Sequence, residues 1–131
     1  MKMNKQDIRN IIYEYFNEAN ERTFNNLVLI LKDVTLFVAM KPQIDQMDNL
    51  ENELLFLEIN DNRYVQTFLE EDDIIKFNKD INLIEIPLKE LIKEILAQQV
   101  KINAVVINPR DLNLTLSYKI LLFLNEVNNL L

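Results

Sequence analysis

The stretch "ELLFLEINDNRYVQTFL", residues 53–69, is the clearest local signal in the chain and decides the kind of sheet that it builds. Two runs that favour strands, about 54–60 and 63–69, flank the pair Asp61-Asn62. A tight two-residue hairpin turn requires positive φ at both central positions, where Gly is favoured and Asn or Asp is the best substitute. Because the chain contains no glycine, it can use only the substitute. The stretch therefore predicts an antiparallel hairpin that turns at Asp61-Asn62.

The residues after the hairpin predict alternating helices and strands. The segment "EEDDIIKFNKD" (70–80) begins with acidic residues, which suit the positive end of a helix dipole. A short strand "INLIEI" (81–86) follows, and Pro87 fits the first turn of the next helix. The apolar residues of "INAVVIN" (102–108) are contiguous, as in a strand covered on both faces. The segment 112–130 predicts mainly a helix from about Ser117, apolar nearly all round, which is either deeply buried or part of a subunit interface.

The residues before the hairpin predict two helices and one strand. An amphipathic helix is expected over 6–20 and a shorter helix over about 25–33. The run "VTLFVAM" (34–40) favours a strand that Pro42 stops, and 42–53 is expected to form a loop. The apolar face expected for the first helix consists of Ile8, Ile11, Ile12, Tyr15 and Phe16.

This order of elements predicts an α+β fold with a mixed sheet of about five strands. The hairpin plus a β-α-β-α-β succession supplies the strands, and the crossover connections place helices against the sheet. A chain of 131 residues is long enough for one sizeable core. We expect a single domain over 1–131.

Composition lowers the expectation of catalysis. The chain contains neither cysteine nor histidine. Thiolate chemistry, disulfides and cysteine-ligated metals are thereby excluded, together with the commonest general base and zinc ligand. An enzyme that works with carboxylates alone remains a minor alternative. We predict a protein without enzymatic activity, cofactor or metal.

The charge pattern argues against nucleic acid and anionic membranes as partners. The net charge is −7, and the fourteen Lys and Arg residues are scattered singly. Binding to a phosphate backbone needs clustered cations, because affinity comes from the release of counterions. The sequence has no run of about 18 apolar residues, and its first ten residues are too polar for a signal peptide. We therefore expect a cytoplasmic protein.

The loop Asn108-Pro109-Arg110 is the main candidate site, because it lies where a buried strand leaves the sheet. Ligands of open α/β sheets favour the crevice beyond the carboxyl ends of strands. Asn can donate and accept hydrogen bonds, and Arg offers a fork suited to carboxylate or phosphate. The alternative is structural, with Pro109 ending the strand while Asn108 holds the loop backbone.

Two further groups of residues are candidates for a role in binding. Tyr64 and Phe68 lie on one face of the second hairpin strand, and we include both as tentative binding residues, with Tyr64 as a residue that could face a partner. The acidic run 70–73 could offer oxygen ligands to a divalent cation. However, consecutive helical residues point in different directions and the run lacks calcium-loop spacing, which favours helix capping and a solvated face.

The order of these segments resembles the SseB N-terminal domain family, named for the bacterial enhanced-serine-sensitivity protein. The hairpin "LEINDNRYVQTF" (57–68), the acidic helix start "LEEDD" (69–73) and the strand end "VVINPR" (105–110) carry the resemblance, which covers roughly 6–128. The chain departs from the family pattern in lacking a glycine in the turn and in having Leu69-Glu70 where Thr-Ser is common. Longer members carry a second, C-terminal domain, for which we expect no room here. The activity of the family is poorly defined, so the resemblance implies more about fold than about function.

Three functions follow as hypotheses. The leading one is an SseB-like domain that binds another protein or forms a homodimer, because the sequence combines missing catalytic residues with excess apolar helix surface. The second is a small-ligand or sensor domain that uses the crevice near the Asn108-Pro109-Arg110 loop. The third is the enzyme that works with carboxylates alone.

Overall fold

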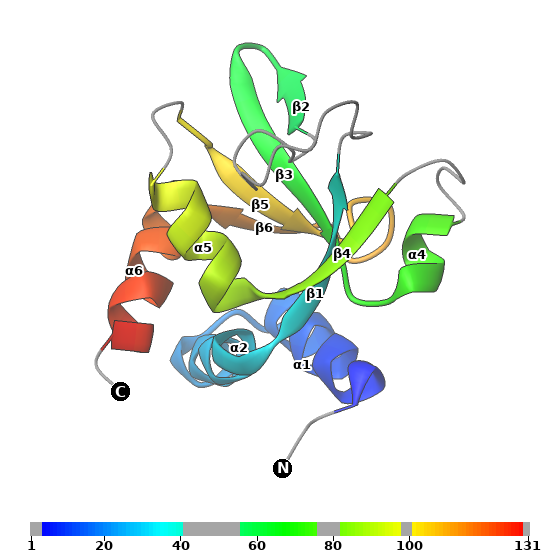
Figure 1. Ribbon diagram of the computed structural model, residues 1–131. Helices are drawn as coiled ribbons and strands as arrows, with labels where there is room; N and C mark the ends of the chain where they lie inside the picture. Colours follow the sequence, from blue (N-terminus) through cyan, green and yellow to red (C-terminus); the bar gives the residue numbers. More distant parts are fainter. Residues whose placement is uncertain (1–3, 41–55, 76–81, 98–100, 130–131) are drawn as a thin grey trace.

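The structure, a computed structural model, describes residues 4–40, 56–75, 82–97 and 101–129. Six strands and five helices are assigned within these ranges (Figure 1). In chain order they are α1 (Lys5–Asn17), α2 (Glu21–Asp33), β1 (Thr35–Met40), β2 (Phe56–Ile59), β3 (Asn62–Phe68), α4 (Glu71–Ile75), β4 (Asn82–Pro87), α5 (Leu88–Ala97), β5 (Ala104–Ile107), β6 (Leu114–Ser117) and α6 (Tyr118–Asn129).

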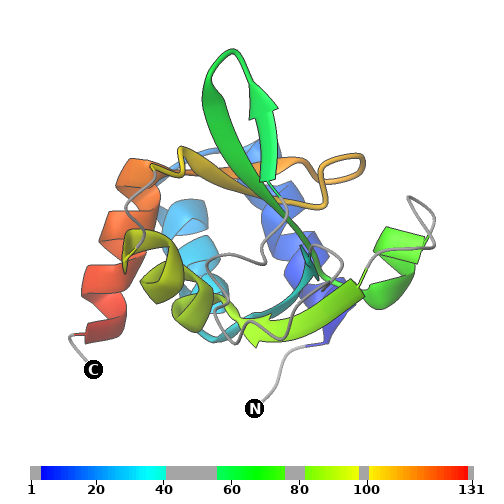
Figure 2. The same cartoon turned by 45° about the horizontal axis from the view of Figure 1, so that its top comes forward.

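The hairpin β2–β3 forms as an antiparallel pair, but its turn lies one residue earlier than predicted. Ile59 pairs with Asn62, so the two central residues are Asn60 and Asp61. Their φ angles are 52° and 68°, in the left-handed region that Asn and Asp tolerate better than other residues with a side chain. The chemistry of the turn is thus as expected. The hairpin tip extends away from the rest of the molecule (Figures 1 and 2).

The strands form one mixed sheet in the order β4-β1-β3-β5-β6, with β2 paired to β3 off this path. β3 runs parallel to β5, with Tyr64 opposite Ala104, and the other pairs are antiparallel. The predicted α+β class with a mixed, helix-flanked sheet is confirmed. β6 is an addition to the predicted strands, and it forms one end of the sheet.

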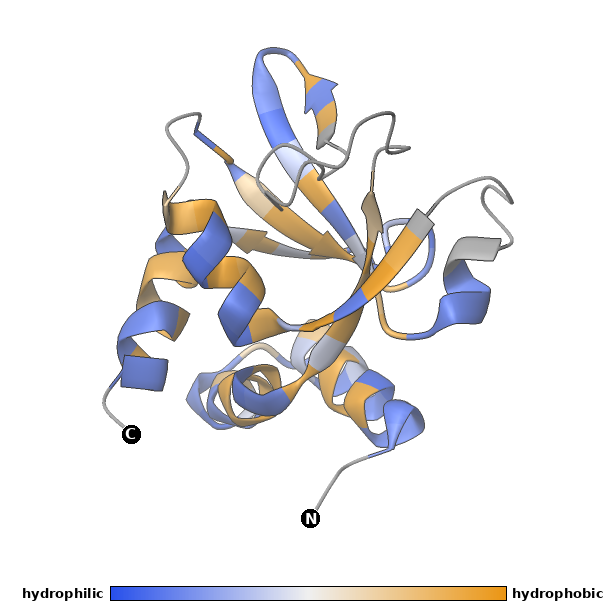
Figure 3. Ribbon diagram, in the orientation of Figure 1, coloured by the Kyte–Doolittle hydropathy of each residue, from blue (hydrophilic) through white to orange (hydrophobic). Residues whose placement is uncertain are grey.

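The helices α1, α2, α5 and α6 pack against one face of the sheet. Their buried residues and the alternate residues of β1, β3, β5 and β6 form one core cluster. Apolar residues line the surfaces on which these helices and the strands meet (Figure 3). A small second cluster of Phe37, Ala39, Phe68 and Leu83 lies on the opposite face. All four residues of β5 are buried, as the contiguous apolar run predicted.

The N-terminal helices differ from their predicted bounds because their caps were not recognised. The side chain of Asn20 accepts a hydrogen bond from the Thr23 backbone N–H, and Thr23 returns one to the Asn20 backbone. This capping box starts α2 at Glu21, several residues before the predicted start, so α1 ends at Asn17. In α1, Ile8 and Ile12 are buried as expected, whereas Phe16 is 46% exposed.

The remaining predictions near the chain centre have mixed outcomes. Pro87 is the last residue of β4 and α5 begins at Leu88, one residue from the predicted arrangement. The predicted loop 42–53 and Pro42 lie outside the described residues. The final helix is neither wholly buried nor wholly exposed, because Leu121 and Leu124 are buried while Leu122 and Phe123 are exposed.

Candidate functional site

The loop between β5 and β6 is a tightly bonded corner. The Asn108 backbone N–H donates to the Thr67 carbonyl at 2.8 Å. The Asn108 carbonyl accepts from the N–H groups of Asp111, at 3.0 Å, and Asn113, at 2.7 Å. Asn108 and Asn113 both have a φ of 50°, which Asn adopts more readily than most residues with a side chain. Two asparagines thus reverse the chain here without glycine.

The Asn108 side chain ties this corner to the connection between β3 and α4. The residue is 2% exposed. Its Oδ1 accepts a hydrogen bond from the Leu69 backbone N–H at 2.9 Å, and its Nδ2 donates to Asp73 Oδ2 at 3.1 Å. Leu69 is itself fully buried, so its N–H would otherwise lack a partner. The structural interpretation, in which Asn108 holds loop backbone, is therefore the one that these contacts support.

Arg9 of α1 completes the corner from the other side. Its Nη2 donates to Asp73 at 3.0 Å and 3.2 Å, and its Nη1 forms an ion pair with Asp111. The Tyr13 hydroxyl donates to Asp111 Oδ1 at 3.3 Å. The hydrogen bond from Arg9 lowers the pKa of the Asp111 carboxyl below its ordinary value. We call Arg9, Asp73, Asn108 and Asp111 the polar corner.

The acidic run 70–73 was expected to cap a helix and face solvent. Glu70, Glu71 and Asp72 are exposed, and Asp73 accepts the Glu70 backbone N–H at 3.2 Å, which is a capping bond. Asp73 in addition contacts Arg9 and Asn108, and its side chain is only 19% exposed. In the described part of the chain, no group of three or more His, Cys, Asp or Glu side chains is arranged to hold a metal ion.

The predicted binding residues do not gather into one exposed site. Beside the buried Asn108, Pro109 is half-buried and Arg110 is exposed. Tyr64 is half-buried between Leu57 of β2 and Ala104 of β5. Phe68 is 3% exposed and packs in the small second cluster, so it cannot meet a partner directly.

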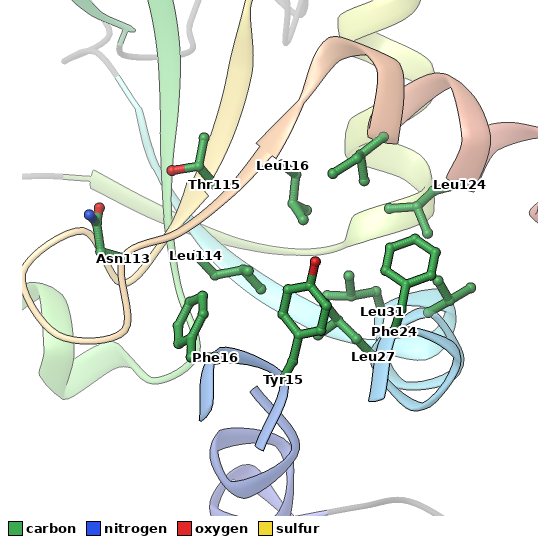
Figure 4. Close-up of a pocket in the computed structure, with 12 residues that line it drawn as sticks. Tyr15, Phe16, Phe24, Leu27, Leu31, Asn113, Leu114, Thr115, Leu116 and Leu124 are labelled. Carbon is green, nitrogen blue, oxygen red and sulfur yellow. The ribbon is translucent and has the colours of Figure 1, made fainter. Parts of the chain in front are cut away.

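A different region offers an open apolar surface. A groove with a volume of about 260 Å³ lies between β6 and the helices α1, α2 and α6 (Figure 4). We call it the β6 groove. Its lining residues are Tyr15, Phe16, Phe24, Leu27, Val28, Leu31, Asn113, Leu114, Thr115, Leu116, Ile120 and Leu124.

Aromatic rings line the helical side of the β6 groove. The ring centroids of Tyr15 and Phe24 are 6.1 Å apart, and those of Phe24 and Phe123 are also 6.1 Å apart. Phe16 and Phe123 are 46% and 42% exposed. Phe16 lies next to Tyr15 and Phe123 lies next to Phe24, so the row of rings ends on each side in an exposed aromatic side chain.

The opposite wall of the groove is β6, and this strand lies at the end of the sheet. Among the described strands it pairs only with β5. Leu114 and Leu116 are buried, whereas Thr115 and Ser117 are exposed. An end strand presents backbone donors and acceptors along its outer edge. The β6 groove therefore combines a sheet edge with an apolar wall.

Strand β6 was not predicted, although the sequence carries a signal for it. "LTLS" (114–117) alternates apolar and polar residues and contains a β-branched residue, which is the pattern of a half-buried strand. The run is only four residues long and continues directly into the apolar helix α6. The apolar pattern of this helix is stronger than the strand pattern of β6, so only the helix was predicted.

Comparison with family models, with curated proteins and with known solved structures finds no match to this chain. The resemblance to the SseB N-terminal family therefore stays a prediction. The part of the chain that the structure describes contains no helix long and apolar enough to cross a membrane.

Proposed function

We propose that this chain is a non-enzymatic protein-interaction domain that binds an extended apolar segment in the β6 groove. The observation that carries the proposal is the meeting of a sheet edge with an aromatic-lined groove of about 260 Å³. Peptides that add to a sheet edge gain affinity from main-chain hydrogen bonds and specificity from pockets that take alternate side chains. The β6 groove supplies both elements.

The chemistry of the lining supports recognition over catalysis. All twelve lining residues are uncharged, and Tyr15 is the only one with an ionisable side chain. Exposed aromatic residues such as Phe16 and Phe123 are typical anchors of protein interfaces. We further propose that this SseB-like domain acts in the cytoplasm.

The polar corner lends less support to the small-ligand alternative. The Asn108 amide is buried, and its oxygen and nitrogen each bond to another segment of this chain. A recognition loop would have to present such groups outward. The β6 groove is for this reason the better location for a binding site.

A peptide-display selection tests the proposal. A library of random dodecapeptides on phage is selected against the immobilised protein, and enriched peptides are synthesised with a fluorophore for polarisation titrations. We expect enriched sequences with alternating apolar residues. Phe16→Ser removes part of the groove wall and should weaken binding about tenfold, since a large apolar side chain contributes about 1.5–3 kcal/mol when it is covered.

Leu29→Ser is the matched control. Leu29 is 62% exposed on α2 and does not line the groove. This substitution also removes exposed apolar surface from a helix, but it should leave the affinity of the selected peptides unchanged. Equal binding to both variants, or failure to enrich any peptide, would show that the β6 groove is not a protein-binding site.

A further inference from the structure

We infer that Thr115 is the residue at which β6 binds the backbone of the partner, and that the partner is an antiparallel strand whose two apolar anchors are separated by one residue. The inference rests on the proposed function and specifies the ligand of the same groove. It follows from the direction of the backbone groups of β6, from the faces on which its side chains lie, and from the uncharged lining of the groove.

The hydrogen bonds of β5 fix the direction of the backbone groups of β6. Asn108 directly follows β5, and its N–H donates to the Thr67 carbonyl of β3 at 2.8 Å. Since backbone groups alternate from one side of a strand to the other, the preceding residue, Ile107, directs its N–H and C=O toward β6. Ile107 lies opposite Leu114, so these two residues form a hydrogen-bonded pair of the antiparallel ladder.

The next residue of β6, Thr115, therefore directs its N–H and C=O to the outer edge of the sheet. Leu116 lies opposite Val105 and faces β5 again. Ser117 faces outward, but it directly precedes α6, and its hydroxyl accepts a hydrogen bond from the Ile120 N–H at 3.4 Å. The carbonyl of such a capping residue accepts the first bond of the helix. Thr115 is thus the one residue of β6 that offers an added strand both a donor and an acceptor.

The side chains of β6 decide which residues of an added strand enter the groove. Leu114 and Leu116 are buried and point toward the ring of Tyr15, whereas the exposed Thr115 points away (Figure 4). Residues that lie directly opposite each other on two paired strands share a face of the sheet. The residue opposite Thr115 therefore points away from the groove, and the residues before and after it point into the groove as the two anchors.

The lining decides the chemistry of the anchors. None of the twelve lining residues carries a charge, and a charged anchor would lose water without gaining a partner. The rings of Tyr15 and Phe24, 6.1 Å apart, suit aromatic or branched apolar side chains. The residue between the anchors lies beside the exposed Thr115 and is free to be polar or charged. Only proline is excluded there, because the N–H of this residue is needed for bonding.

The antiparallel direction follows from the two free groups of Thr115. In this direction both groups bond to one residue of the partner, in the more stable of the two ladder geometries. The N–H of the residue between the anchors then donates to the Thr115 carbonyl, while the N–H groups of the anchors point away from β6. In a parallel strand the anchors themselves would carry the hydrogen bonds.

N-methylation of the selected peptides tests this arrangement. Alanine substitution first identifies the two anchors in the shortest enriched peptide that binds, and each residue is then N-methylated in turn. Methylation between the anchors should weaken binding at least about tenfold in polarisation titrations, because it removes a hydrogen bond and obstructs the edge. Methylation of either anchor should change the affinity less than about twofold. Equal tolerance at all positions, or loss at the anchors alone, would overturn the inference.

Substitution of Thr115 provides the second arm. Thr115→Pro removes the outward N–H without breaking a ladder bond to β5, and edge strands tolerate proline at such positions. It should weaken peptide binding at least about tenfold. Thr115→Val is the matched control, because it keeps the N–H and alters only a side chain that points away from the groove, so its affinity should equal that of the natural chain. Circular dichroism checks that both variants remain folded, and the methylated peptides decide the question if Thr115→Pro does not fold.

The inference and the proposed function fail in different ways. If Phe16→Ser weakens binding while Thr115→Pro and the methylated peptides bind as tightly as their parents, the groove takes side chains without adding a strand, and only the inference fails. If Phe16→Ser leaves the affinity unchanged, the proposed function fails and the inference fails with it.

Discussion

The polar corner and the β6 groove adjoin each other, but the first is built from polar side chains and the second from apolar ones. Asn113 connects the two, since its N–H donates to the carbonyl of Asn108 and the residue also lines the β6 groove (Figure 4). In the corner, polar groups bond to one another and join three distant segments. In the groove, apolar groups face outward beside an open strand edge. In this protein the bonded polar side chains therefore stabilise the fold, and the surface that is available for recognition is apolar.

The largest effect that separates the two regions is expected from Arg9→Met. This variant keeps the length of the side chain but removes both ion pairs, leaving the largely buried Asp73 without its cation. Breaking such a pair typically costs about 3 kcal/mol, because an uncompensated charge remains in a poorly solvated place. Urea unfolding measures the loss of unfolding free energy. Peptide affinity at the groove should remain as it was in variants that stay folded.

Arg22→Met is the control for Arg9→Met. Arg22 also pairs with a carboxylate, that of Glu14, but both side chains are well exposed. Surface pairs of this kind contribute little to stability, so no measurable change in the urea midpoint is expected. If both variants lost stability equally, the corner would not be the special feature that we describe.

A smaller effect is expected from Asn108→Gly. Glycine tolerates the positive φ at this position but removes the amide that accepts the Leu69 N–H. A buried N–H without a partner costs about 2 kcal/mol, and thermal and urea unfolding should both show a loss of that order. Asp61→Gly is the matched comparison, because Asp61 also has positive φ but lies exposed in the hairpin turn. We expect that variant to be as stable as the natural chain or slightly more so.

The smallest effect concerns acid. The pKa of Asp111 is lowered in the folded state, chiefly by its hydrogen bond to Arg9, from an ordinary value of 3.8. A lowered pKa means that the ionised form stabilises the fold above pH 3.8, and that this contribution is lost as the pH falls through the folded-state pKa. The carboxylate is 46% exposed, so less than about 1 kcal/mol is expected. The stability difference between the natural chain and Asp111→Asn should shrink below pH 4. An unchanged difference between pH 7 and pH 3 would contradict this assignment.

Much of the fold could be predicted because the strongest patterns are local. The hairpin follows from strand-forming residues around a turn that only Asn and Asp can make, and β5 follows from four contiguous apolar residues. Strand β6 was not predicted, because its four alternating residues give a weaker pattern than the apolar helix that follows them. The start of α2 was missed because a cap formed by Asn20 and Thr23 lies outside the apolar period.

The candidate site was harder to predict because it depends on long-range contacts. The position of Asn108 at the end of a buried strand was evident, but its partners Leu69 and Asp73 lie more than thirty residues away. Whether such an amide points inward or outward depends on contacts that a single local pattern does not encode. Phe16 fitted the apolar period of α1 and nevertheless became exposed, because α1 ends one residue later.

The parallel pairing of β3 with β5 also bears on how the chain is synthesised. Tyr64 meets Ala104, forty positions further on, so one edge of the central strand stays uncovered until those residues have been added. At a synthesis rate of roughly 5–20 residues per second, the wait is about 2–8 seconds. Throughout it, a strand with one open side is present in a crowded cell, where unpaired edges attract other chains. The order of the strands therefore leaves the nascent chain with an unpaired strand edge during that interval.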